Sequence, residues 1–292
     1  MADSLIDLIK VLRDRTGAGL MDCKGALLAN DCDLDKATDW LREKGLAKAA
    51  KKADRIAAEG LALTAQCKCG CRTIILEVNC ETDFVAKGDQ FRAFVEAIAS
   101  NILANKYESL EAAKDGVKDL VADATVKMGE KFDLRRYEIL KKEDNQLFGT
   151  YIHMGGKIAV ALILEGGSPE LAKGLAMHIA ANNPLYLTLN DVPADVLAHE
   201  RDVQREASKN DPKFMAKPAE FQEKILDGKL NKYFSEMALA SQTYLMDDTK
   251  NVAQVLKDNG ASVKCFVRYQ VGEGIEKRQD DFANEVMKEI NK

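Results

Sequence analysis

The chain contains 292 residues, of which 46% are hydrophobic and 30% charged, and its net charge is −5 at pH 7. This length allows two or three domains, each with its own hydrophobic core. The acidic balance excludes a general attraction to phosphate backbones, and an aromatic content of 6% offers few surfaces for base stacking. A nucleic-acid-binding protein would therefore need a local basic patch.

Signals for export and for membrane insertion are both missing. The first fifteen residues mix acidic and basic side chains with apolar ones, unlike a secretory signal. The longest apolar run, residues 158–164, is far shorter than a membrane span. Seven cysteines, an odd number, indicate reduced thiols in such a chain. We therefore expect a cytoplasmic protein that does not enter membranes.

Three short helices are predicted in the first fifty residues. Apolar residues recur at helical spacing from Leu5, a second helix passes through Leu28, and a third begins near Leu34. Gly45 is a typical end signal for the third helix. The Ala- and Lys-rich stretch that follows predicts a solvated helix or a linker.

The middle of the chain presents one pattern twice. Residues 61–66 and 72–78 are strand-like runs separated by a short turn, which predicts a β-hairpin, and an amphipathic helix over residues 91–102 follows. Residues 147–167 and 169–181 present the same order of hairpin and helix. The repetition predicts an internal duplication of a β-β-α unit.

The last hundred residues begin with a charged helical region over residues 191–244. Two X-Pro steps interrupt it, which predicts an antiparallel helical hairpin projecting from the second repeat. A half-buried strand comes next, and a short helix carrying Phe282 ends the chain. The residues predicted to share one face of that strand are Val263, Cys265, Val267, Tyr269 and Val271.

These elements together predict the α+β class. We expect an N-terminal helical domain with a basic linker over residues 1–54 and a first core subdomain over residues 55–140. A second core subdomain covers residues 141–274 and includes the inserted helical hairpin at about 191–244. A C-terminal helical module covers residues 275–292.

The sequence CKCGC raises the question of a metal site. Cys67, Cys69 and Cys71 are possible thiolate ligands, with Cys80 as a fourth. Cys80 follows Cys71 by nine positions, mostly along a strand, and so lies about 30 Å away at about 3.3 Å per residue. We favour small turn residues over a zinc site, and we expect neither a metal nor a cofactor.

Constellations that would indicate an enzyme are missing. None of the three histidines, His153, His178 and His199, has a partner at the spacing of a known triad or metal motif. The sequence also contains no Walker signature. We therefore expect no catalytic residues. The basic residues between Arg42 and Arg55 are interleaved with acids and indicate a solvated helical face, with contact to RNA as the alternative.

The stretch ETDFVAKG allows two interpretations. Thr82 is a natural N-cap and Asp83 favours the positive end of a helix, while Phe84 stands seven residues before Phe91. On one continuous helix both phenylalanines would face the core. A break at Gly88, with a new cap at the next residue, would leave Phe84 free to contact another molecule. Both interpretations remain open at this point.

Several long motifs resemble those of the bacterial elongation factor Ts family, over essentially the whole chain. LEVNCETDFVAK resembles the signature of the family, and AMHIAA and VGEGIEK resemble later landmarks. VLRDRTGAGLMDCKGALLANDCDLDKATDWLREKGL resembles its ubiquitin-associated-type (UBA-like) helical module. The resemblance implies guanine-nucleotide exchange on elongation factor Tu, bound with GDP or nucleotide-free, without a cofactor. The alternative is a non-catalytic RNA- or ribosome-associated α+β protein.

The resemblance also implies a binding segment. Thr82, Asp83, Phe84 and Val85 correspond to residues that intrude near the nucleotide-bound Mg²⁺ of elongation factor Tu. Gly88 stands where the family commonly has Asn.

Further contacts to the partner are implied at three other places. The candidates are Leu20 and Met21 in the helical module, His153 and Met154 at the tip of the second hairpin, and Met128. Met128 and Lys131 replace the usual residues of an IGEN motif. The helical hairpin is a possible homodimer contact, and no direct binding of nucleic acid is expected.

Overall fold

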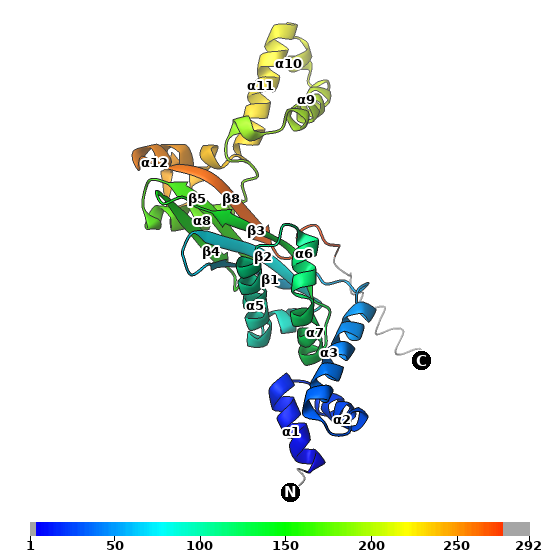
Figure 1. Ribbon diagram of the computed structural model, residues 1–292. Coiled ribbons are helices and arrows are strands. Elements are labelled where there is room, and N and C mark those ends of the chain that lie inside the picture. Colours follow the sequence, from blue (N-terminus) through cyan, green and yellow to red (C-terminus); the bar gives the residue numbers. More distant parts are fainter. Residues whose placement is uncertain (1–3, 277–292) are drawn as a thin grey trace.

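The computed structural model describes residues 4–276, in which helices and strands are mixed along the chain, as the α+β class requires (Figure 1). The predicted C-terminal helix with Phe282 lies outside the described residues. No helix in the described part is both long and apolar enough to cross a bilayer.

The N-terminal helices are α1 (Leu5–Thr16), α2 (Leu20–Ala29) and α3 (Leu34–Lys51). Their buried apolar residues, among them Leu12, Leu27 and Leu41, form one cluster. These helices lie at one end of the elongated molecule (Figure 1).

The predicted end of the third helix at Gly45 is wrong, since α3 continues to Lys51. Gly45 lies instead where α3 packs against α7 (Lys118–Met128). A Cβ at this position would lie 2.7 Å from the carbonyl oxygen of Ala122 and 2.8 Å from a methyl group of Val126. The glycine therefore serves close helix packing and not helix termination.

Two three-stranded antiparallel sheets form the core. The first has the order β1-β2-β3 and the second β4-β5-β8. Their strands are β1 (Glu59–Gln66), β2 (Arg72–Cys80), β3 (Asp133–Lys141), β4 (Gln146–His153), β5 (Ile158–Glu165) and β8 (Ser262–Gln270). The sequence analysis did not predict β3, nor the helices α6 (Leu110–Gly116) and α7 before it.

The two sheets face each other and helices cover their outer faces. Small and apolar side chains such as Ala62, Ile75, Ala159 and Ile163 fill the space between the sheets. Side chains of α5 (Asp89–Asn105) and α7 pack on the first sheet, and those of α8 (Pro169–Asn182) and α12 (Val252–Asp258) on the second. Each half of the core thus has two paired strands, a covering helix and a later third strand.

One face assignment on β8 is wrong. Val263 pairs with Leu164 while Cys265 pairs with Ile163, so two residues of β8 advance against one of β5. Such a β-bulge reverses the side to which residues beyond it point. Val263 consequently packs in the cluster with α8, whereas Cys265 and every second residue after it face the space between the sheets.

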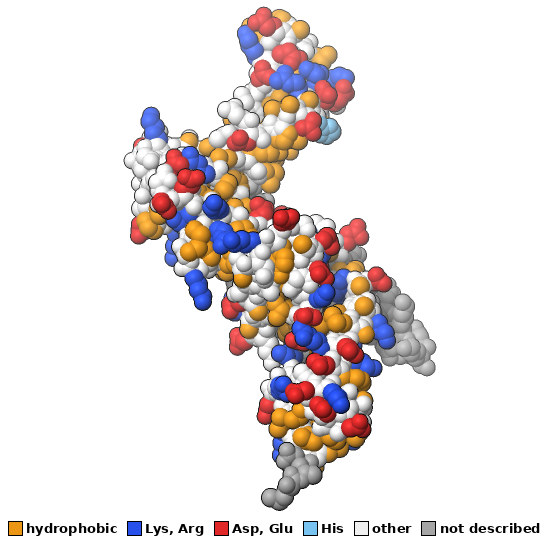
Figure 2. Space-filling view, viewed as in Figure 1, with side chains coloured by type: hydrophobic (Ala, Val, Ile, Leu, Met, Phe, Trp, Pro, Cys, Tyr) orange, Lys and Arg blue, Asp and Glu red, His pale blue; other side chains and the backbone are white. Residues whose placement is uncertain are grey.

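A helical arm extends from the second half at the end opposite to the N-terminal helices (Figure 1). It consists of α9 (Ala194–Ser208), α10 (Pro212–Met215) and α11 (Ala219–Ser235). Basic and acidic side chains lie side by side on its surface (Figure 2), and Arg205 pairs with Glu223 at 3.0 Å across the two long helices. The short elements around it are η1 (Leu189–Asp191), η2 (Leu239–Ser241), β6 (Thr243–Tyr244) and β7 (Asp247–Asn251).

Glu77 on β2 is fully buried and accepts hydrogen bonds from both sheets. Its carboxylate accepts from Nη1 of Arg135 at 3.0 Å and from Nε of Arg136 at 2.7 Å, both on β3. It also accepts from the backbone N–H of Gly272, just after β8, at 2.8 Å. One carboxylate therefore joins the two sheets at this point.

His178 on α8 is buried and held as a neutral imidazole. Its Nε2–H donates to Oε1 of Gln242 at 2.9 Å, and its Nδ1 accepts from the backbone N–H of Leu245 at 3.1 Å. Burial lowers the pKa of His178, against a smaller opposing effect of the Gln242 hydrogen bond. Protonation would therefore oppose folding.

We expect the free energy of unfolding to fall below pH 6.5 and to depend on His178. The unfolded chain binds this proton near pH 6.5, whereas the folded chain binds it only at lower pH. Stability is therefore lost as the pH drops, by at most about 1.4 kcal/mol per pH unit. Urea unfolding between pH 7 and 5 should give a shallower pH dependence for His178→Gln than for the wild type. Exposed His199 provides the control, His199→Gln, and equal slopes for all three proteins would contradict the assignment.

We expect Gly45→Ala to destabilise the protein by about 1–3 kcal/mol, because the added methyl group overlaps the backbone of α7. The matched control is Gly25→Ala in α2, where a Cβ meets nothing within 4 Å. That substitution should stabilise by about 0.5–1 kcal/mol through helix propensity alone. Chemical denaturation measures both, and a stabilising Gly45→Ala would refute the packing role.

Candidate functional site

The stretch that contains Phe84 forms a separate turn of helix, α4 (Asp83–Ala86), between β2 and α5. Thr82 is its N-cap, and the Thr82 hydroxyl oxygen accepts from the N–H of Val85 at 3.4 Å. Gly88, with extended backbone, caps α5, so Asp89 is the first residue of that helix and not its cap. The predicted break between the two helices is therefore present. The residue that caps the second helix lies one position earlier than expected.

Phe84 projects from this turn into solvent. Its side chain is 85% exposed, the largest fraction among the exposed large hydrophobic residues of the described chain. Phe91 on α5 is fully buried, and Ala86 and Val85 on the turn pack against the first core cluster. Phe84 is thus not a core residue, and the break directs the two phenylalanines to different environments.

The side chain of Glu130 holds the backbone that leads into α4. One carboxylate oxygen accepts from the backbone N–H groups of Glu81 at 3.0 Å and Thr82 at 3.1 Å. The other accepts from the Thr82 hydroxyl at 2.6 Å. The backbone N–H of Lys131 in turn donates to Glu81 at 2.7 Å. The role of Glu130 is not predicted from the sequence, because an acidic residue 48 positions away from Thr82 carries no local signal of this contact.

Asp83 and Lys87 form an ion pair on the exposed side of the turn, with 2.6 Å between Oδ2 and Nζ. The Lys87 hydrogen bond lowers the pKa of Asp83. The same bond raises the pKa of Lys87. Asp83 therefore stays a carboxylate, and its pairing along the helix favours one orientation of the turn.

The β4–β5 turn lies beside the start of α5. Nη2 of Arg92 donates to the carbonyl oxygen of Gly155 at 3.2 Å, and the N–H of Ala62 donates to that of Gly156 at 2.8 Å. Met154 in this turn is 71% exposed with a φ of 49°, and exposed His153 precedes it. The structure thus brings this candidate pair close to the helix that follows the Phe84 turn.

The other candidate contacts lie elsewhere. Leu20 and Met21 begin α2 among the N-terminal helices, with 53% and 71% of their side chains exposed. Met128 ends α7 and is half-buried against the first core cluster. Leu20 and Met21 thus belong to the N-terminal helices, whereas Met128 stands two residues before Glu130, which accepts a hydrogen bond from Thr82.

Half of the six basic residues in the stretch predicted as an alternative RNA contact are paired with acids of the same chain. Three of its residues form ion pairs: Arg42 with Asp119, Lys48 with Asp22, and Arg55 with Glu81. Such pairing reduces the free positive charge that phosphates would meet. The stretch thus behaves as a solvated and paired helical face.

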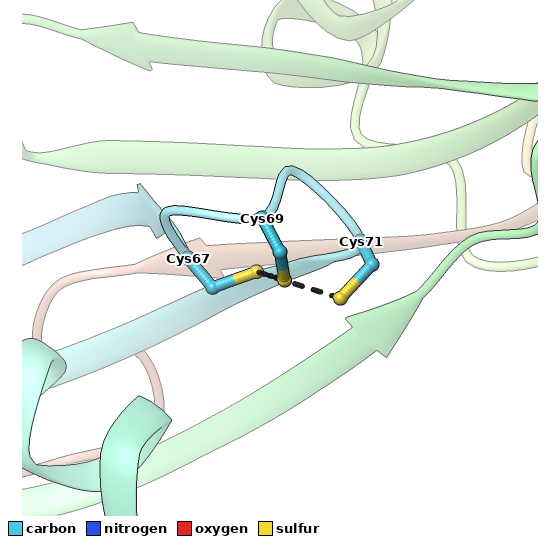
Figure 3. A group of neighbouring side chains, drawn as sticks. All are labelled: Cys67, Cys69 and Cys71. Carbon is cyan, nitrogen blue, oxygen red and sulfur yellow. Dashed lines mark hydrogen bonds between the residues drawn. The ribbon is translucent and has the colours of Figure 1, made fainter.

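The thiols of Cys67, Cys69 and Cys71 gather at the β1–β2 turn (Figure 3). Burial opposes ionisation of Cys67, but hydrogen bonds from the thiols of Cys69 and Cys71 and from the N–H of Arg72 lower the pKa of Cys67 to about 6. Cys80 is separate and buried, and burial raises the pKa of Cys80 to about 12. Among the described residues, the three turn thiols are the group of metal-ligating side chains close enough to share an ion.

We expect Glu130→Gln to loosen the Phe84 turn without unfolding the core. The amide places an N–H₂ group against backbone donors, and loss of hydrogen bonds to a charged group costs about 1–3 kcal/mol. Hydrogen exchange at Glu81 and Thr82 should accelerate, while exchange on α5 stays slow. Glu96→Gln on the exposed face of α5 is the control. Unchanged exchange at Thr82 would contradict the positioning role of Glu130.

Comparison with known proteins identifies the family. The model of the family "Elongation factor TS" matches residues 81–273. The chain is also 47% identical over 296 aligned positions to the elongation factor Ts of Pediococcus pentosaceus, and the alignment covers 99% of each protein. The chain belongs to the elongation factor Ts family.

Proposed function

We propose that this chain performs guanine-nucleotide exchange on elongation factor Tu through the Phe84 turn. Membership of the family supports the activity and the partner. The observation that supports the turn as the site is the exposure of Phe84 on a one-turn helix capped at Thr82. We place the protein in the cytoplasm and assign it no bond-making chemistry.

Binding is favoured when a partner covers an exposed phenylalanine. Burial of such a side chain contributes about 1.5–3 kcal/mol, and aromatic anchors in a fitted pocket dominate many interfaces. The hydrogen bonds of Glu130 hold the turn before the partner arrives. Less conformational freedom is then lost on binding, which favours the complex.

The effect on the nucleotide follows from the demands of Mg²⁺. The ion requires near-ideal octahedral geometry and links the protein to the phosphates. We infer that Phe84 enters an apolar crevice beside this ion and displaces groups that orient its ligands, so that GDP is released. Asp83, held by Lys87, keeps the turn oriented for this entry.

The same coupling operates in both directions. If the chain binds nucleotide-free elongation factor Tu more tightly than the GDP form, GDP must weaken its binding by the same factor. Nucleotide entering the vacant site then releases the chain. The protein therefore acts as a regulator that binds one state of its partner preferentially.

Two further contacts fit this arrangement. Met154 and His153 lie on a turn that touches the start of α5, so they can meet the same partner beside Phe84. Leu20 and Met21 form an exposed apolar pair at the start of α2, in the helices that we interpret as a UBA-like module. We propose both pairs as secondary contacts.

We expect Phe84→Ala to reduce stimulated GDP release at least about tenfold, the equivalent of about 1.4 kcal/mol of lost interaction in the exchange complex. The measurement follows release of a fluorescent GDP from bacterial elongation factor Tu with catalytic amounts of the chain. The matched control is Phe221→Ala, since Phe221 on the arm is also exposed, at 55%.

Both variants should show the thermal unfolding of the wild type, because neither side chain lies in the core. If Phe84→Ala accelerates GDP release as well as Phe221→Ala does, the Phe84 turn is not the site. If the wild type itself fails to accelerate release, the exchange role is wrong for this chain.

A further inference from the structure

The β1–β2 turn holds three thiols that the proposed exchange site does not use. Sγ of Cys67 lies 3.0 Å from Sγ of Cys69 and 3.7 Å from Sγ of Cys71. All three sulfur atoms lie within 4.8 Å of one another, gathered on one side of the turn (Figure 3). Cys69 is exposed and Cys67 and Cys71 are half-buried, so packing alone does not force the three sulfur atoms together, and their convergence calls for a role.

We propose that Cys67, Cys69 and Cys71 together bind one soft metal ion of the Cu⁺ and Zn²⁺ class. Thiolate ligands select such ions over Mg²⁺ or Ca²⁺. With metal–sulfur bonds of about 2.3 Å, three sulfur ligands lie roughly 3.8–4.0 Å apart, in tetrahedral or trigonal arrangement respectively. The separations of 3.0 and 3.7 Å lie below this value and the third is at most 4.8 Å, so side-chain adjustments of about 1 Å form the site.

The site offers three protein ligands and one open side. Cys80 is buried elsewhere and is not in the thiol group of the described residues. Cys69 is exposed, so solvent reaches the open side of a bound ion. Cu⁺ accepts three thiolates without a fourth ligand, whereas Zn²⁺ would take a water molecule as its fourth ligand.

The turn supplies the backbone geometry and a stabilising donor. Gly70 adopts a φ of 71°, which allows the chain to reverse between Cys69 and Cys71. The N–H of Arg72 donates to Sγ of Cys67 at 3.1 Å. A hydrogen bond of this kind favours the thiolate, the form that binds metal. The three ligands therefore belong to one hairpin turn.

This site lies at the opposite end of β2 from the Phe84 turn. The strand runs from Arg72 to Cys80, about 30 Å at 3.3 Å per residue. A bound ion ties the ends of β1 and β2 without touching the residues proposed to contact elongation factor Tu. Metal binding and nucleotide exchange should therefore be separable by mutation.

The test uses the reduced full-length protein, titrated without oxygen with Cu⁺ in one arm and Zn²⁺ in the other, each against a chromophoric chelator. We expect one tight site per chain in at least one arm. Cys69→Ser should weaken it at least about 100-fold, beyond the usual effect of losing an outer hydrogen-bond partner. Cys32→Ser removes an exposed thiol outside the group and should leave the affinity unchanged.

X-ray absorption on the loaded protein should detect three sulfur ligands at about 2.3 Å. GDP release with Cys69→Ser should match the wild type, which shows that the fold is intact. Equal affinity of Cys69→Ser and wild type would overturn the proposal, as would an equal loss in Cys32→Ser. The free thiols of the protein as isolated should also be counted. If two of the seven are missing and reductant restores them, a disulfide at the turn is indicated, and the proposal is overturned.

Discussion

The buried carboxylate of Glu77 is the interaction on which the arrangement of the two sheets depends. It accepts hydrogen bonds from Arg135 and Arg136 on β3 and from the backbone of Gly272 beyond β8. A buried charge is tolerated only when partners compensate it, and removal of one partner of a buried pair costs about 3–5 kcal/mol. The two halves of the core are therefore held together by a carboxylate whose hydrogen-bond partners cannot be removed without a large loss of stability.

The position of β2 determines where the Phe84 turn begins. Cys80 follows Glu77 by three positions, and its thiol donates to the carbonyl oxygen of Thr82 at 3.2 Å. Glu130 reaches the same backbone from the end of α7. A fixed strand end, a cap and a long-range carboxylate together give Phe84 a defined direction. The exposed aromatic side chain is thus placed by polar contacts of the neighbouring backbone and cap and not by apolar packing of its own.

Patterns of apolar residues were sufficient to predict much of the fold. The apolar run from Ile74 to Val78 reflects a strand buried on both faces. The helical spacing from Phe91 reflects burial on one face, and a sequence records both patterns directly. Gly45 misled the helix prediction, because a glycine that ends a helix and one that admits a neighbouring helix look identical. Val263 was placed on the wrong face because a β-bulge has no signature in alternation alone.

The candidate site was only partly accessible to such reasoning. The sequence left two environments for Phe84 open, since the break at Gly88 is a matter of backbone conformation. The capping role of Thr82 followed from its side chain, whereas the part played by Glu130 depends on contact between distant segments. The convergence of Cys67 with its two neighbours likewise depends on how the turn orients its side chains.

Separate capping of α4 and α5 has a consequence for how such a protein evolves. The short helix carrying Phe84 and the long helix covering the first sheet begin at different caps, Thr82 and Gly88. A change of the exposed side chain at position 84 therefore does not alter the packing of α5. This position can vary during evolution while the selective pressure for a stable fold acts on other residues.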